Sequence, residues 1–191
     1  MGQFWSHRWW SGAAGILGSA ILLGTAPAWA CRAGTPAAPS PDSREFSSDR
    51  YGLTLDIPAN YRAMLRTGGS ITFHDPVSFE FIQCLVRSGR YGRVPLHPVL
   101  ETYTVPPNST LSLVDLVRRR RPWVDYYNPQ FEAVELAGQP ALRYEYRHEI
   151  HRVQFLNVSF LTPDGQSLLT LSGPATDPVL TTAIATLRFW P

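Results

Sequence analysis

The residues of this chain that could do chemistry fall into a histidine cluster, an arginine run, an aromatic loop and two cysteines. The histidine cluster lies in YRHEIHR, where His148, Glu149 and His151 are types that bind transition metals. The two histidines are three residues apart, so on a strand they would point to opposite faces. We therefore expect solvated polar residues near a hairpin end and no metal site. His74, in the turn segment FHDP, is predicted to be structural.

Four consecutive arginines form the most conspicuous charge run. Four successive helical residues sweep about 300° around the axis, so they cannot form one flat face. We expect either a solvated helix end or an anion-facing patch for lipid headgroups or an acidic protein, whose attraction would weaken with salt. The candidate contact residues are Arg118, Arg119, Arg120 and Arg121.

The loop PWVDYYNP follows the arginine run and carries three aromatic residues that could contact a partner, Trp123, Tyr126 and Tyr127. The alternative is a loop folded onto the core. A second candidate contact region is 87–108, which is rich in proline and long for a loop of a compact domain. Both loops are predicted to be contact surfaces.

No short catalytic or cofactor-binding motif is found in the sequence. It contains no G-x-S-x-G segment and no C-x-x-C pair. The segment SGRYGRVP lacks the spacing of a phosphate-binding glycine loop. The sequence therefore predicts no catalytic residue and no cofactor, and an enzyme without a short motif is the less favoured alternative.

The N-terminal segment has the layout of a secretory signal peptide, residues 1–30. His7 and Arg8 give a weakly positive start, and Ala28 and Ala30 supply the small residues that signal peptidase needs. The uncharged run between them is shorter than the roughly 20 apolar residues that cross a bilayer. This favours cleavage after Ala30 over a permanent anchor.

Cleavage would leave Cys31 as the first residue, which is where a bacterial lipoprotein carries its acyl chains. Ala28 and Trp29 match the lipoprotein pattern poorly, so plain cleavage is favoured and lipidation of Cys31 is the alternative. Cys84 is expected to be a small core hydrophobe in a buried strand. A disulfide between the two cysteines is the least favoured interpretation.

Residues 31–45 are rich in Pro, Ala and Ser and are expected to be a disordered tail. Residues 46–191 are enough for a single domain. The mature chain has 16 arginines, no lysine and 15 acidic residues, for a formal net charge of +1. That balance argues against nucleic-acid binding, and a monomer is expected.

Hydrophobic periodicity and turn residues predict mostly strands, with two helices. The helices are 108–121, capped by Ser109 or Thr110, and 177–187, capped by Asp177 with Pro178 at its first position. The absence of regular βαβ alternation predicts an α+β domain whose antiparallel sheet is covered by helices. The predicted strands are 51–58, 59–65, 70–76, 77–87, 131–136, 139–147, 152–162, 166–173 and 187–191.

Residues 46–190 resemble the PsbP-like family, whose members include extrinsic lumenal subunits of photosystem II and exported bacterial relatives. The resemblance implies an α/β/α sandwich around a central antiparallel sheet. It also implies an exported domain in the periplasm or thylakoid lumen, often attached to a membrane or a membrane complex. No functional residue transfers from it. The segments that carry it are FSSDRYGLTLDIPANY, ITFHDP, LAGQPALRYEYR and TPDGQSLLTLSGPATDPVLTTAIATLRFW.

Together these features predict an exported, non-catalytic accessory or binding protein held near a membrane complex such as photosystem II. Peripheral membrane association, with attachment through Cys31, is part of that expectation. The alternative is a periplasmic protein that binds a small ligand or a metal in a cavity between sheet and helices.

Overall fold

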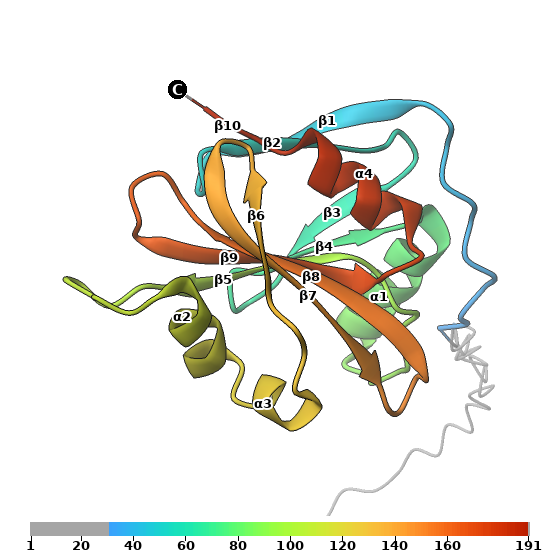
Figure 1. The fold of residues 1–191 in the computed structure, drawn as a ribbon. Coiled ribbons are helices and arrows are strands. Elements are labelled where there is room, and N and C mark those ends of the chain that lie inside the picture. Colours follow the sequence, from blue (N-terminus) through green and yellow to red (C-terminus); the bar gives the residue numbers. More distant parts are fainter. Residues whose placement is uncertain (1–30, 191) are drawn as a thin grey trace, which may run out of the picture. The chain divides into compact units, whose positions relative to one another are not determined.

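The computed structural model describes residues 31–190, so the predicted signal peptide, residues 1–30, lies outside the described residues. This part of the chain forms two antiparallel sheets and four helices (Figure 1). The strands are β1 (Ser43–Ser48), β2 (Leu53–Pro58), β3 (Arg62–Leu65), β4 (Ile71–His74), β5 (Val99–Thr104), β6 (Glu132–Leu136), β7 (Gln139–His148), β8 (Val153–Leu161), β9 (Ser167–Pro174) and β10 (Arg188–Phe189). The helices are α1 (Pro76–Ser88), α2 (Leu113–Arg120), α3 (Val124–Tyr127) and α4 (Pro178–Thr186).

The larger sheet has seven strands in the order β3-β4-β5-β9-β8-β7-β6, and the smaller sheet has the order β1-β2-β10. All neighbouring strands are antiparallel. The predicted turns join the hairpins. Ala137 and Gly138 have φ of 50° and 75° between β6 and β7, and Gly165 has φ of 68° between β8 and β9. The α+β class and the antiparallel sheet are confirmed.

One face of the seven-stranded sheet is covered by apolar residues of α4 and the smaller sheet, and we call it the closed face. Alternate strand residues point to the same face. Phe73, Leu100 and Phe160 point to this face and are fully buried. They pack in one cluster with residues of β2 and α4, namely Leu53, Leu55, Ile57, Val179, Leu180 and Ala183. Figure 1 shows α4 beside β1 and β2, over the larger sheet.

The opposite face of the same sheet, here the polar face, buries hydroxyl, amide and imidazole groups. Ser159 and Thr170, on neighbouring strands, share a hydrogen bond of 2.8 Å between their hydroxyl oxygens. Leu116 and Val117 of α2 cover part of this face and pack on Tyr144. Its buried polar strand residues are Thr72, His74, Asn157, Ser159, Thr170 and Ser172.

Residues 77–87 lie in the helix α1, so the strand predicted there is wrong. Asp75 caps the helix, because its Oδ1 accepts hydrogen bonds from the amides of Val77 at 3.1 Å and Ser78 at 3.2 Å. Pro76 occupies the first helical position, where its missing amide costs nothing. A segment that is apolar on both faces of a strand can equally be a helix. The buried residues Ser78, Phe81, Ile82 and Leu85 have helical spacing.

The predicted loop 87–108 contains the strand β5, which pairs with β4 and β9. Its prolines flank the strand, and the carbonyl of Pro98 accepts a hydrogen bond from the amide of Phe73 at 3.0 Å. The predicted helix 108–121 begins later, at Leu113, and its cap is Ser112 rather than Ser109 or Thr110. The second helix is capped by Asp177, as predicted.

Residues 31–42 are ordered, in contrast to the predicted disordered tail, and residues 43–45 belong to β1. A disulfide joins Cys31 to Cys84, 53 positions later in α1, so Cys84 is not a core residue of a strand. The amide of Ala37 donates to Asp75 at 2.9 Å, which holds the segment beside the start of α1. The disulfide uses the sulfur atom of Cys31 that lipidation would require, so the two states exclude each other.

Residues 31–190 contain no helix with the length and apolar composition needed to cross a membrane.

Candidate functional site

The candidate site is a cluster of four aromatic residues, here the aromatic surface, made of the exposed Trp123 and Tyr126 and the half-buried Tyr127 and Tyr146. The ring centroid of Trp123 lies 5.9 Å from that of Tyr127 and 4.9 Å from that of Tyr146. The ring centroid of Tyr127 lies 5.2 Å from that of Tyr126 and 4.9 Å from that of Tyr146. Three of these pairs are edge-to-face, an arrangement that aromatic rings favour.

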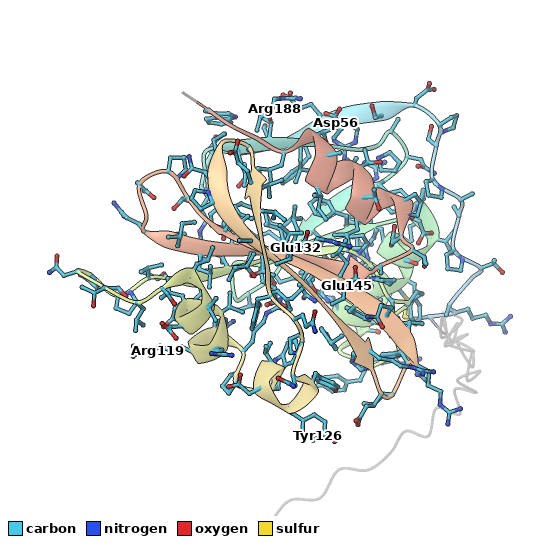
Figure 2. The ribbon with its side chains drawn as sticks, viewed as in Figure 1. Asp56, Arg119, Tyr126, Glu132, Glu145 and Arg188 are labelled. Carbon is cyan, nitrogen blue, oxygen red and sulfur yellow. A yellow bond between two sulfur atoms is a disulfide. The ribbon has the colours of Figure 1, made fainter. Side chains whose placement is uncertain are left out.

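The short helix α3 brings three of these residues to the sheet. Pro122 follows α2 and prevents its continuation, because a proline lacks an amide donor. Val124 is fully buried against the polar face, and Asn128 ends α3 with φ of 44°. Trp123 and Tyr126 remain exposed around this anchor. Figure 2 shows the side chain of Tyr126 at the outer end of α3, directed away from the sheet.

The buried side chain of Arg121 lies beneath the aromatic surface and is 5% exposed. Its Nη1 donates to Asn157 Oδ1 at 2.6 Å and to the hydroxyl of Tyr144 at 3.3 Å. Its Nη2 forms an ion pair with Glu101 at 2.8 Å, and its guanidinium carbon lies 5.4 Å from the ring centroid of Trp123. Arg121, predicted as a partner contact, therefore supports the aromatic surface from below.

The other three arginines of the run point in different directions, as expected from the helical sweep. Arg118 forms an ion pair with Asp125 at 3.0 Å. The guanidinium of Arg120 lies over the ring of Tyr103, 5.7 Å from its centroid. Arg119 is exposed on the outer side of α2 (Figure 2). The run is therefore divided among separate contacts.

The histidine cluster lies at the end of the β7–β8 hairpin, next to the aromatic surface. The ring centroids of His148 and His151 are 4.7 Å apart. Glu149 accepts a hydrogen bond from the hydroxyl of Tyr126 at 3.3 Å. Within residues 31–190, no three His, Cys, Asp or Glu side chains are grouped so that they could hold a metal ion. Two separate sequence features, the aromatic loop and the histidine cluster, thus meet in space.

The hydroxyls of Tyr126 and Tyr146 stay protonated near neutral pH. Burial raises the pKa of Tyr146 to about 12. The negative charge of Glu149 raises the pKa of Tyr126. Trp123 is 38% exposed and Tyr126 is 74% exposed. The surface can therefore bind a partner through aromatic faces and hydroxyl donors.

His74 lies away from this surface, on β4, and is 1% exposed. Its Nε2 is 2.7 Å from the hydroxyl oxygen of Thr72, and its ring centroid is 4.1 Å from that of His97. Burial, followed by the nearby His97 and Arg66, lowers the pKa of His74 to about 3. His74 is therefore a neutral, buried part of the polar face.

Sequence reasoning did not identify Tyr146 or Phe155, whose rings stack with centroids 5.6 Å apart. A signal for Tyr146 was present, because Leu142, Tyr144 and Tyr146 alternate along β7 and share one face. Tyr144 is buried beneath α2 and Tyr146 reaches beyond it to α3. The alternation along β7 shows a stripe of large apolar side chains, but it does not show at which residue α2 stops covering that stripe.

The fold is similar to the solution structure of cyanobacterial PsbP (CyanoP) from Synechocystis sp. PCC 6803. The TM-score is 0.51 and the identity is 14%, and the match covers 82% of this chain and 96% of that chain. A crystal structure from Bacteroides thetaiotaomicron VPI-5482 has a TM-score of 0.42 and 13% identity, over 78% of this chain and 48% of that chain. No family model and no curated protein sequence matches this chain. The fold is PsbP-like, as predicted.

Proposed function

We propose that this chain is an exported, non-catalytic binding protein that holds a segment of a membrane protein complex against its aromatic surface. The observation that carries the proposal is the accessibility of Trp123 and Tyr126 within a cluster of rings in edge-to-face contact. Tryptophan and tyrosine are the residues that most often dominate binding energy at protein interfaces.

The aromatic surface is also organised before binding, which lowers the entropic cost of association. Tyr127 and Tyr146 hold the ring of Trp123 from two sides, and the buried Arg121 lies below it. Few side-chain torsions remain to be fixed when a partner arrives. This favours a binding role for the surface.

The charges beside the aromatic surface favour a partner segment that carries a carboxylate. A shallow depression next to Tyr127 is lined by Arg147, Glu149 and Arg152. Glu149 already accepts a hydrogen bond from Tyr126, whereas the two arginines are exposed. A carboxylate of the partner would pair with them, so binding should weaken as the salt concentration rises.

The choice of a membrane complex as partner rests on the PsbP-like fold together with the predicted signal peptide. The family that the sequence resembles includes extrinsic subunits of photosystem II, which makes that complex one candidate. The same features support a location in the periplasm or thylakoid lumen.

The proposal is tested by affinity capture of the exported protein from mildly solubilised membranes, with partners identified by mass spectrometry. We expect a membrane complex to co-purify with the natural protein. The Trp123→Ala variant should lose about thirtyfold in affinity for it, the effect of removing a central aromatic contact.

The matched control is Trp190→Ala, because Trp190 is 42% exposed, close to the value for Trp123, but belongs to the end of the chain after β10. This control should capture as much partner as the natural protein. Equal capture by both variants, or no complex captured at all, would contradict the proposal.

A further inference from the structure

The end of α1 and the loop that follows it present three arginines and two apolar side chains to solvent, and we call residues 86–93 the basic loop. Arg87, Arg90 and Arg93 are all exposed. Val86 is 71% exposed and Tyr91 fully so. The sequence has no acidic residue between Glu80 and Glu101. The loop therefore combines uncompensated positive charge with exposed apolar surface.

The backbone of the basic loop is held against α1 while its side chains point outward. Gly89 ends α1 with φ of 63°, and the amide of Arg90 donates to the carbonyl of Leu85 at 3.0 Å. A Cβ atom on Gly92 would lie only 2.8 Å from Leu85 Cδ1, so this glycine allows close packing of the loop on the helix. The exposed side chains are thus presented from a fixed backbone.

The three arginines of the basic loop differ from four other arginines of the fold. Arg118, Arg121, Arg143 and Arg188 each pair with a carboxylate. Within residues 31–190, no carboxylate lies within 4.0 Å of the guanidinium groups of the basic loop. Their charge is available to a partner that carries negative groups.

The disulfide places the beginning of the described chain at the same surface. Cys31 is bonded to Cys84 of α1, and the sulfur atom of Cys31 lies 3.6 Å from the hydroxyl oxygen of Ser88, which belongs to the basic loop. Arg32 follows Cys31 and is exposed. The chain that continues from the predicted signal peptide therefore enters the domain beside the basic loop.

We propose that the basic loop, with Arg32, is a docking site for an anionic lipid surface. Guanidinium groups bind phosphate through two parallel hydrogen bonds. Tyrosine and aliphatic side chains enter the boundary between headgroups and acyl chains, where the ring is buried and the hydroxyl remains hydrated. The site uses no residue of the aromatic surface, and it does not require an acyl chain on Cys31.

The test measures binding of the naturally processed protein to vesicles of phosphatidylcholine with phosphatidylglycerol and to vesicles of phosphatidylcholine alone. Binding should require the anionic lipid and decrease with salt. Each arginine near an anionic surface contributes about fivefold in affinity, so the variant Arg87→Gln, Arg90→Gln, Arg93→Gln should bind about a hundredfold more weakly. Tyr91→Ala should reduce binding severalfold.

The matched control removes three exposed arginines elsewhere, in Arg50→Gln, Arg62→Gln, Arg119→Gln, and has the same net charge. It should retain binding within about threefold of the natural protein, because attraction to the surface falls off within a Debye length. Equal losses in the two triple variants would overturn the proposal, since only net charge would then matter. The proposal would also be overturned if the protein bound polyglutamate as tightly as the anionic vesicles and Tyr91→Ala changed neither affinity. An acidic protein would then be the partner of the basic loop.

Discussion

The closed face of the seven-stranded sheet buries leucine, valine and phenylalanine, whereas the polar face buries hydroxyl, amide, imidazole and guanidinium groups. Apolar burial stabilises a fold without demanding exact partners. Each buried polar group has to be paired, and an unpaired group costs free energy. The closed face thus stabilises the fold by apolar burial, whereas the polar face requires hydrogen-bond partners in specific positions. The exposed aromatic surface stands on the second of these faces.

The unpaired polar atoms of the described residues support this division. His74 Nδ1, His148 Nδ1 and Asn157 Nδ2 are buried and have no hydrogen-bond partner within residues 31–190. All three residues belong to strands of the seven-stranded sheet and point to its polar face. The polar face is therefore less favourable for stability than its opposite, which is typical of regions kept for function.

The largest expected effect comes from the closed face. Phe160→Ala removes a fully buried ring and should lower the free energy of unfolding by about 3–5 kcal/mol, measured by urea denaturation. Phe155→Ala, on the same strand but the polar face, removes a half-buried ring and should cost about 1–2 kcal/mol. Equal losses of unfolding free energy in the two variants would contradict the difference in stabilisation between the two faces.

Acid should destabilise the polar face through His74. Its pKa is about 3 in the folded protein and near 6.5 when unfolded, so below pH 6.5 the unfolded chain binds the proton more readily. Its stabilising contribution is complete above pH 6.5 and is lost as the pH falls toward 3. Between pH 6.5 and 4.5 the loss should be about 2–3 kcal/mol. In His74→Gln the slope of unfolding free energy against pH should decrease, and an unchanged slope would contradict this assignment.

Removal of the Arg121 side chain should have the next largest effect. Arg121→Met leaves Glu101 and Asn157 without their charged donor and should cost about 2 kcal/mol of unfolding free energy. Arg119→Met, in the last turn of α2 and exposed, should change stability by less than about 0.5 kcal/mol. A similar result for both variants in thermal or urea denaturation would show that the buried network contributes nothing.

The smallest expected effect comes from the rim of the aromatic surface. Tyr126→Phe removes an exposed hydrogen bond to Glu149 and should change the free energy of unfolding by less than about 0.5 kcal/mol. Tyr51→Phe removes a buried hydrogen bond of 2.8 Å to the carbonyl of Gly69 and should cost about 1 kcal/mol. The comparison fails if the exposed hydroxyl proves to be the more stabilising one in urea denaturation.

Most strands and hairpins could be predicted because their signals are local. A polar–apolar alternation marks a strand with unlike faces, and Ala137-Gly138 or TPDGQ marks a turn. The same dipeptide, Asp-Pro, starts both α1 and α4, but the sequence predicts a helix start only at Asp177-Pro178. At Asp75-Pro76 the apolar run that follows fits a buried strand as well as a helix, so periodicity alone does not decide.

The features that could not be predicted depend on contacts between distant residues. The ordering of residues 31–42 requires Cys84, Asp75 and Asn60 to be nearby, and composition contains no information about them. The aromatic surface requires β7 to lie beside α3, which brings Tyr146 to Trp123. The aromatic types were visible in the sequence, but their assembly follows from tertiary packing.

The disulfide between Cys31 and Cys84 also determines how mechanical force would enter the domain. Tension applied at residue 31 passes through the two sulfur atoms directly into α1. Without that bond it would run along residues 32–42 to β1, an edge strand of the smaller sheet, and open its hydrogen bonds to β2 in succession. The domain can therefore be held by its N-terminal end while β1 carries no load.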